Sequence, residues 1–156
     1  MNEELLNEIA ALKKEKDAVI LAHYYVRPEV QAIADYIGDS FYLSKVAANL
    51  DAKTIVFAGV FFMGESAKVL NPGKTVLLPD MKADCAMAHM ADIATIQKMR
   101  ETYDDLAVVC YINSTAELKQ HSDVCVTSSN AVKIVKALPN KNIFFIAMTM
   151  IMITNF

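Results

Sequence analysis

The chain has 156 residues, of which 54% are hydrophobic and 21% charged, and its formal net charge is −3. This length suits one domain or two small ones, and the acidic balance offers no basic footprint for a nucleic-acid partner. The longest apolar run, Ile143–Ile153, is shorter than the roughly 20 residues that a membrane-spanning helix needs, so no membrane partner is expected. The amphipathic, charged N-terminus does not look like a signal peptide, so we expect a cytoplasmic protein without structural disulfides.

The first half of the chain alternates helical and strand patterns. The N-terminal stretch MNEELLNEIAALKKEK predicts an amphipathic helix, and the continuous apolar run Ala18–His23 is typical of a strand buried on both faces. Pro28 predicts the start of a helix that ends at Gly38. Asp39 or Ser40 is expected to cap the next helix. Further elements are strands at Thr54–Gly59 and Thr75–Pro79, with a helix around Glu65 between them.

The second half shows the same alternation. Ile93, Ile96 and Tyr103 mark a helix that Asp92 can cap. Strands are expected at Ala107–Ile112, Val124–Thr127 and Asn142–Ile146, and helices at Thr115–Gln120 and Asn130–Leu138. Because strands alternate with helices throughout, the sequence predicts an α/β fold with parallel sheets and helical cover.

An internal repeat relates the two halves. A shift of 88 residues places Ile20–Ala58 on Val108–Ile146 without a gap, keeps the apolar positions in phase and matches eight identical residues. These identities run from Glu29 on Glu117 to Phe57 on Phe145. They favour a duplicated unit. The alternative is the chance periodicity that α/β chains share.

The repeat pairs polar residues at the carboxyl ends of strands. His23 falls on Tyr111, and Tyr25 falls on Asn113. In open α/β sheets, ligands bind outside the carboxyl ends of the strands. From the pattern alone the tyrosines could simply pack, and Asn113 could simply cap the helix near Thr115.

Ser40 and Ser128 also coincide, each near the start of a predicted helix. They are candidates for N-caps first and for anion ligands second, because free N–H groups and the helix dipole favour phosphate or carboxylate there. Two copies of this layout predict two walls of one anion-binding site.

The three cysteines differ in their surroundings. Cys85 lies in LLPDMKADCAMAHM, a turn-like segment between a strand and a helix, where it is either a buried structural thiol or one ligand of several. Cys110 and Cys125 lie within strand-like runs, where a free cysteine usually behaves as a small buried hydrophobic residue. The three histidines are not spaced for zinc.

Five stretches resemble the A-type quinolinate synthase family, an iron–sulfur enzyme family of NAD biosynthesis. They are ILAHYYVRPEVQAIADYIGDS, VFAGVFFMGESAKVLNP, DCAMAHM, CYINSTAE and VTSSNAVKIV; they run in family order and cover nearly everything from Val19 to Ile146. The resemblance implies repeated three-layer α/β/α domains with short parallel sheets around a pseudo-threefold axis. This chain would hold about one and a half to two of these domains.

The resemblance also implies an activity and its residues. The family is a transferase that condenses iminoaspartate with dihydroxyacetone phosphate to quinolinate, and a functional contact with L-aspartate oxidase belongs to the same implication. Each domain gives one cysteine to a [4Fe–4S] cluster, and the motif cysteine maps to Cys85. The catalytic histidine and tyrosines map to His23, Tyr25 and Tyr111. The substrate-binding positions are His23, Ser40, Tyr111, Asn113 and Ser128.

Other motif residues have plainer interpretations. Met63 and Glu65 match the family's F-M-x-E stretch and are expected to serve packing and the start of a helix. Tyr24 is expected to be structural, and His89 and His121 to be surface or helix residues.

The expected domains are 1–84, an incomplete second domain at 85–146, and a tail at 147–156. The tail reads AMTMIMITNF, where the family continues with a Pro-Asp-x-Asn-Leu type segment. We therefore expect the chain to be truncated, and with one of three expected cysteine ligands it is not expected to hold a stable cluster as a monomer or to be active alone. The competing hypotheses are a non-catalytic anion-binding α/β module and an inert fragment whose apolar tail drives association.

Overall fold

The structure, a computed structural model, describes residues 2–147 and 150–154, with side chains through residue 147. The chain divides into two compact units, Met1–Asp84 and Cys85–Phe156. Among the described residues, no helix is both long and apolar enough to cross a membrane.

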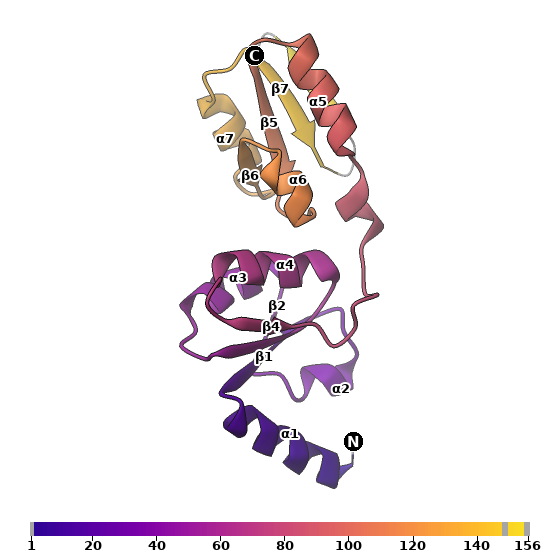
Figure 1. Cartoon of the computed structure of the whole chain (residues 1–156), viewed down its shortest axis with the longest axis vertical. Coiled ribbons are helices and arrows are strands. Elements are labelled where there is room, and N and C mark those ends of the chain that lie inside the picture. Colours follow the sequence, from indigo (N-terminus) through magenta and orange to yellow (C-terminus); the bar gives the residue numbers. More distant parts are fainter. Residues whose placement is uncertain (1, 148–149, 155–156) are drawn as a thin grey trace. The chain divides into compact units, whose positions relative to one another are not determined.

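The first unit is a parallel sheet covered by helices on both faces, in the strand order β2-β1-β3-β4. Figure 1 shows α3 and α4 on one face of the sheet and α1 and α2 on the other. The fully buried Leu21, Leu43 and Phe57 form part of its core. The strands are β1 (Ala18–His23), β2 (Tyr36–Gly38), β3 (Thr54–Ala58) and β4 (Thr75–Leu77); the helices are α1 (Glu3–Glu15), α2 (Pro28–Gln31), α3 (Ser40–Asn49) and α4 (Phe61–Leu70).

The predicted helix from Pro28 to Gly38 is wrong. Helix α2 ends at Gln31, and Tyr36–Gly38 forms the edge strand β2, which pairs parallel to β1. Asp35 starts this pairing, because its N–H donates to the Ile20 carbonyl at 2.9 Å and its carboxylate accepts from the Ile20 N–H at 2.8 Å. These long-range hydrogen bonds stabilise a strand in this segment, although its apolar residues have the spacing of a helix.

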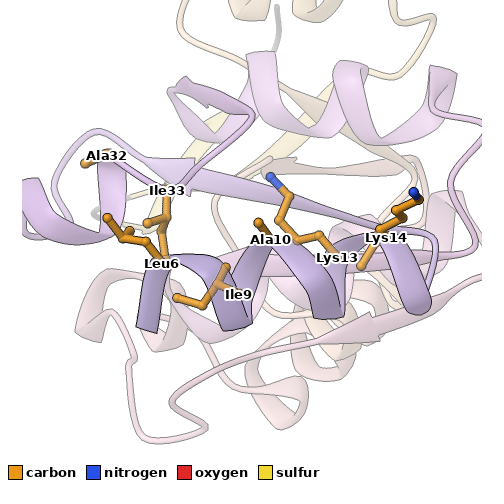
Figure 2. A pocket seen from close by; sticks show the side chains of 8 residues that line it. Leu6, Ile9, Ala10, Lys13, Lys14, Ala32 and Ile33 are labelled. Carbon is orange, nitrogen blue, oxygen red and sulfur yellow. The ribbon is translucent and has the colours of Figure 1, made fainter. Parts of the chain in front are cut away.

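Helix α1 buries none of its residues, although it has the predicted amphipathic pattern. Its Leu6 and Ile9 line a pocket of about 470 Å³, together with Ala32 and Ile33 from the segment after α2 (Figure 2). Asn2 caps the helix by accepting from the Glu4 N–H at 3.1 Å.

The second unit has the strand order β6-β5-β7-β8. Figure 1 shows β5 between β6 and β7. The first three strands pair in parallel, and β8 runs antiparallel to β7. Apolar clusters lie on both sheet faces, one reaching Ile96 and Leu118 and the other reaching Val135, so this unit too has three layers. The strands are β5 (Leu106–Tyr111), β6 (Val124–Val126), β7 (Asn142–Ile146) and β8 (Met150–Thr154); the helices are α5 (Ile93–Thr102), α6 (Ala116–Gln120), α7 (Ala131–Ala137) and a short 3₁₀ helix, Ala86–His89.

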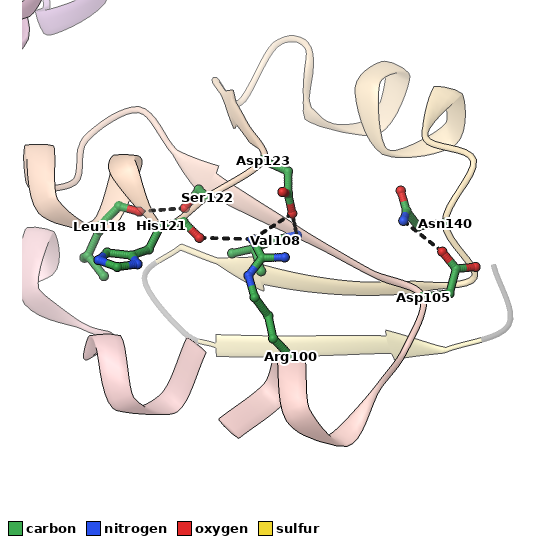
Figure 3. Close-up of polar contacts among 8 residues, drawn as sticks. All are labelled: Arg100, Asp105, Val108, Leu118, His121, Ser122, Asp123 and Asn140. Atoms are coloured by element: carbon green, nitrogen blue, oxygen red, sulfur yellow. Dashed lines mark hydrogen bonds and ion pairs between the residues drawn. The ribbon is translucent and has the colours of Figure 1, made fainter. Parts of the chain in front are cut away.

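The 88-residue repeat is confirmed by equivalent hydrogen bonds that occur within each of the two units. The Asp35 carboxylate accepts from the Ile20 N–H at 2.8 Å, and the Asp123 carboxylate accepts from the Val108 N–H at 2.7 Å (Figure 3). Each pair lies where a short edge strand begins to pair with the central strand.

A second hydrogen bond also occurs at equivalent positions in both units, just before each central strand. The Asp17 carboxylate accepts from the Lys53 N–H at 3.2 Å, and the Asp105 carboxylate accepts from the Lys141 N–H at 3.0 Å. Both lie where the third strand of each unit begins. The matching strand registers and the matching aspartate–backbone hydrogen bonds therefore define one structural unit that occurs twice.

The edges differ. Strand β4 pairs parallel to β3, whereas β8 takes the equivalent place beside β7 in the antiparallel direction. The described backbone Met150–Thr154 thus pairs with β7 in the direction opposite to that of the other strands of this sheet.

Candidate functional site

A pocket of about 380 Å³ in the second unit brings four of the candidate residues together. Cys85, Tyr111, Asn113 and Ser128 all contribute to its wall. The other lining residues are Met87, Ser114, Ala131, Phe145 and Ala147. These residues come from four separate segments, so only the folded unit assembles the pocket.

Tyr111 and Ser128 form the polar contact of this pocket. Their hydroxyl oxygens lie 3.0 Å apart, and either one can donate. The contact follows from the parallel pairing of β5 and β6, in which Tyr111 is the register partner of Val126 and both strands end at the same edge. Ser128 is exposed, so this hydroxyl pair is open to a ligand.

The structure corrects the capping role of both serines. Helix α7 begins at Ala131, with Asn130 at its N-cap position, so Ser128 lies in the turn before it. In the first unit Asp39 is the N-cap and accepts from the Tyr42 N–H at 2.7 Å, while Ser40 is already helical. Ser128 is therefore occupied with Tyr111 and not with the helix start.

Asn113 and Ser114 lie in the loop after β5. Thr115 caps α6 by accepting from the Leu118 N–H at 3.2 Å, so Asn113 is not the cap. Its half-buried side chain lines the pocket, beside Ser114, which is only 3% exposed. Sequence reasoning missed Ser114, although its place directly after the candidate Asn113 was a signal.

Cys85 stands at the N-cap position of the 3₁₀ helix, and its carbonyl accepts from the Ala88 N–H at 2.9 Å. It is half-buried, and it is not part of a disulfide. Its sulfur is the only thiol that lines this pocket within the described residues. The part of the chain that the structure describes contains no group of three or more potential metal ligands.

His23 lies at the carboxyl end of β1 and is 7% exposed. Its Nδ1 accepts from the Tyr25 N–H at 3.2 Å, so the neutral ring carries its proton on Nε2. Burial lowers the pKa of His23, and the nearby Asp39 carboxylate opposes this shift with a smaller effect. Burial thus favours the neutral form of the imidazole.

Two tyrosine rings surround this histidine. Tyr24 stacks on His23 with ring centroids 4.6 Å apart, and Tyr25 meets it edge-on at 4.7 Å. Tyr25 is 83% exposed, and the Tyr25 hydroxyl raises the pKa of Tyr24. Tyr24 was expected to be structural; it packs on His23 but keeps an exposed face.

Ser40 is half-buried in the first turn of α3, one residue after Asp39. Because His23 is the register partner of Gly38, the start of α3 lies close to the histidine along the chain path. The first unit thus carries His23, Tyr25 and Ser40 at one sheet edge. That the two units form walls of one site stays a prediction.

The remaining motif residues fit their plainer interpretations. Met63 is 5% exposed within α4, and Glu65 is half-buried on the same helix. His89 is exposed, and the His121 carbonyl accepts from Arg100 at 3.2 Å (Figure 3). None of these four lines the pocket of the second unit.

Comparison with known proteins gives a consistent answer. The family model described as "Quinolinate synthetase A protein" matches residues 7–151. The chain is 66% identical over 140 residues to a quinolinate synthase of Fusobacterium nucleatum subsp. nucleatum, covering 90% of this chain and 47% of that protein. It is 53% identical over 146 residues to that of Clostridioides difficile, covering 94% and 48%.

A quinolinate synthase of Thermococcus onnurineus is 54% identical over 143 residues, covering 92% of this chain and 47% of that protein. The chain spans about half the length of the curated relatives it matches. The match to the family model nevertheless covers nearly all of this chain, including every residue of the pocket described above. The chain belongs to the quinolinate synthetase A protein family.

Proposed function

We propose that this chain contributes to quinolinate synthesis in NAD biosynthesis, as the part of a transferase that carries one cluster cysteine and one polar wall of the site. The reaction condenses iminoaspartate with dihydroxyacetone phosphate, with loss of phosphate and water. The observation that carries the proposal is the gathering of Cys85, Tyr111, Asn113 and Ser128 around one pocket in a chain of this family.

The polar wall suits anionic substrates. The hydroxyl pair of Tyr111 and Ser128 can rotate to donate to a carboxylate or phosphate oxygen, and the Asn113 amide offers donors and an acceptor. Phe145 and Ala131 add apolar surface to the same pocket. A small, multiply charged substrate with a carbon skeleton fits this mixture.

The residues that can transfer protons are the neutral His23 and the hydroxyl of Tyr111. Because the pKa of His23 is lowered by burial, its ring is neutral at pH 7 and can take up a proton. Tyr111 can give a proton to a leaving hydroxyl and recover it through Ser128. These roles suit imine formation and dehydration, which both require proton transfers.

Cys85 is the residue that would ligate the proposed [4Fe–4S] cluster, because ligation requires thiolates. When bound, such a cluster with one open iron supplies a Lewis acid that polarises a carboxylate or hydroxyl. The chain supplies one of three thiolates, so the proposal assigns the other two to the length of the relatives that this chain does not span.

Two further parts of the proposal follow from the chemistry of the substrate. Iminoaspartate is an imine that water hydrolyses, so we propose a functional contact with L-aspartate oxidase, which would deliver it. We also propose a cytoplasmic location, where thiolates stay available to iron.

The test is a chimera in which this chain replaces the matching half of the Fusobacterium nucleatum relative. After anaerobic reconstitution, we expect a brown protein that forms quinolinate from iminoaspartate and dihydroxyacetone phosphate. Cys85→Ala should abolish both colour and activity, while the matched control Cys125→Ser should keep both.

The controls separate the proposal from its competitors. Cluster and activity that persist in Cys85→Ala would contradict the proposal. If the chimera binds phosphate but forms no quinolinate, the anion-binding module becomes the better description. Tyr111→Phe should lower activity while leaving the colour unchanged, because the hydroxyl acts on substrate and not on iron.

A further inference from the structure

Cys110 and Cys125 face each other across the sheet of the second unit. They are register partners in the parallel ladder between β5 and β6, so their side chains project from the same face. Neighbouring strands run about 4.8 Å apart, which places their Cα atoms within the spacing that a disulfide requires. Cys125 packs against the same apolar cluster that contains Cys110.

The environments of the two thiols shift their pKa values in opposite directions. The Cys125 thiol, the hydroxyls of Ser114 and Ser122 and the Lys119 ammonium stabilise the thiolate of Cys110 and lower its pKa to about 6, against the opposing effect of burial. The hydrogen bond to Cys110 and burial raise the pKa of Cys125, which therefore keeps its proton. A thiolate thus lies beside a thiol.

The fold itself does not need this pair. The equivalent register partners in the first unit are Ala22 and Ile37, which fill the same positions without sulfur. Cys110 is fully buried, whereas Cys125 is half-buried and leaves one approach to the pair. A packing role would therefore be met by the residues that the other copy uses.

We propose that Cys110 and Cys125 are a peroxide-responsive cysteine pair that forms a reversible disulfide within the folded unit. The Cys110 thiolate attacks one oxygen of hydrogen peroxide, the O–O bond breaks, and hydroxide leaves as water after protonation. The Cys125 sulfur then attacks the resulting sulfenic acid, the S–O bond breaks, and a second water leaves. Two thiols are oxidised and one peroxide is reduced to two waters.

A dithiol reverses the reaction by thiol–disulfide exchange and is itself oxidised to a cyclic disulfide. The crosslink would lie one residue before Tyr111, whose hydroxyl contacts Ser128 in the pocket. In its protonated form the Cys110 thiol donates to the Tyr111 carbonyl at 3.4 Å, and disulfide formation removes that donor. The disulfide itself does not depend on the proposed function.

The experiment uses the full chain. The reduced protein is treated with equimolar hydrogen peroxide, then unfolded in the presence of an alkylating agent and mapped by peptide mass spectrometry. We expect the loss of two of the three alkylatable thiols, a peptide that links Cys110 to Cys125, and full reversal by dithiothreitol. Cys85 should remain alkylatable.

Matched variants test the assigned roles. Cys85→Ser should keep the disulfide, and Cys125→Ser should leave a sulfenic acid on Cys110 that dimedone traps. The folded chain should also form the link faster than the chain in urea, because the ladder holds the two sulfurs together. A linked peptide that contains Cys85, full alkylation of Cys110 and Cys125 after treatment, or a faster reaction in urea would overturn the proposal.

Discussion

The Asp123 carboxylate offers the sharpest test of how the repeated unit is held together. It accepts from the N–H of Val108, a fully buried residue, at 2.7 Å, and it forms a 3.0 Å ion pair with Arg100 (Figure 3). Substitution to alanine leaves the buried N–H without this acceptor. A buried polar group that loses its partner costs about 1–3 kcal/mol.

The ion pair contributes much less. The side chains of Arg100 and Asp123 are 39% and 45% exposed, so solvent screens their attraction. Exposed ion pairs contribute about 0–1 kcal/mol. Arg100→Ala is therefore the matched control, since it removes the charge partner and leaves the acceptor of Val108 in place. Asp123→Asn should fall between the two, because its amide oxygen can still accept.

The assay is urea unfolding combined with hydrogen exchange of the peptide that covers Leu106–Tyr111, which reports on the second unit alone. We expect Asp123→Ala to lower the free energy of exchange by about 1–3 kcal/mol and Arg100→Ala by less than about 1 kcal/mol. If Arg100→Ala costs as much as Asp123→Ala, the ion pair and not the buried N–H determines stability, and the reasoning is wrong.

Three other predictions follow from single residues. Because burial lowers the pKa of His23, the folded protein favours the neutral imidazole. The stability that the neutral imidazole contributes should be lost as the pH falls below the ordinary pKa of 6.5 toward the lower pKa of the folded state. An NMR titration should show that the pKa in the folded protein lies below 6.5. Phe144→Ala should destabilise by about 3–5 kcal/mol in urea unfolding, because Phe144 is 3% exposed, whereas Val132→Ala, at a site 68% exposed, should change stability by less than about 0.5 kcal/mol. Gly38→Ala should destabilise by about 1–3 kcal/mol because its Cβ would overlap the Tyr42 ring, and the double variant with Tyr42→Ala should recover part of that loss; no recovery would contradict the contact.

The sequence predicted the central strands correctly because each is a continuous apolar run. Ala18–His23 and Asn142–Ile146 carry no helical period and are buried on both faces, so their pattern has one structural solution. The caps at Asp39 and Asp92 were also predictable, since each carboxylate accepts from an N–H three residues later. These features depend on local chemistry alone.

The edge strand β2 shows where local patterns fail. Tyr36–Gly38 has three residues, exposed tyrosine and isoleucine side chains, and no alternation that distinguishes it from a helix end. The repeat itself predicts a strand at this position, because the shift of 88 residues places Tyr36 on Val124, which was expected in a strand. A short strand is stabilised by its partner, so only pairing with β1 decides its conformation.

The sequence by itself therefore determined the α/β class, the duplication, the family and the residue types of the candidate site. Tertiary structure alone decided which of those residues meet. Tyr111 and Ser128 are 17 positions apart, and their 3.0 Å contact exists because β5 and β6 end at the same edge. The same ladder sets Cys110 against Cys125. Strand register depends on hydrogen bonds between distant segments, and no local pattern of side chains specifies which residues it will bring together.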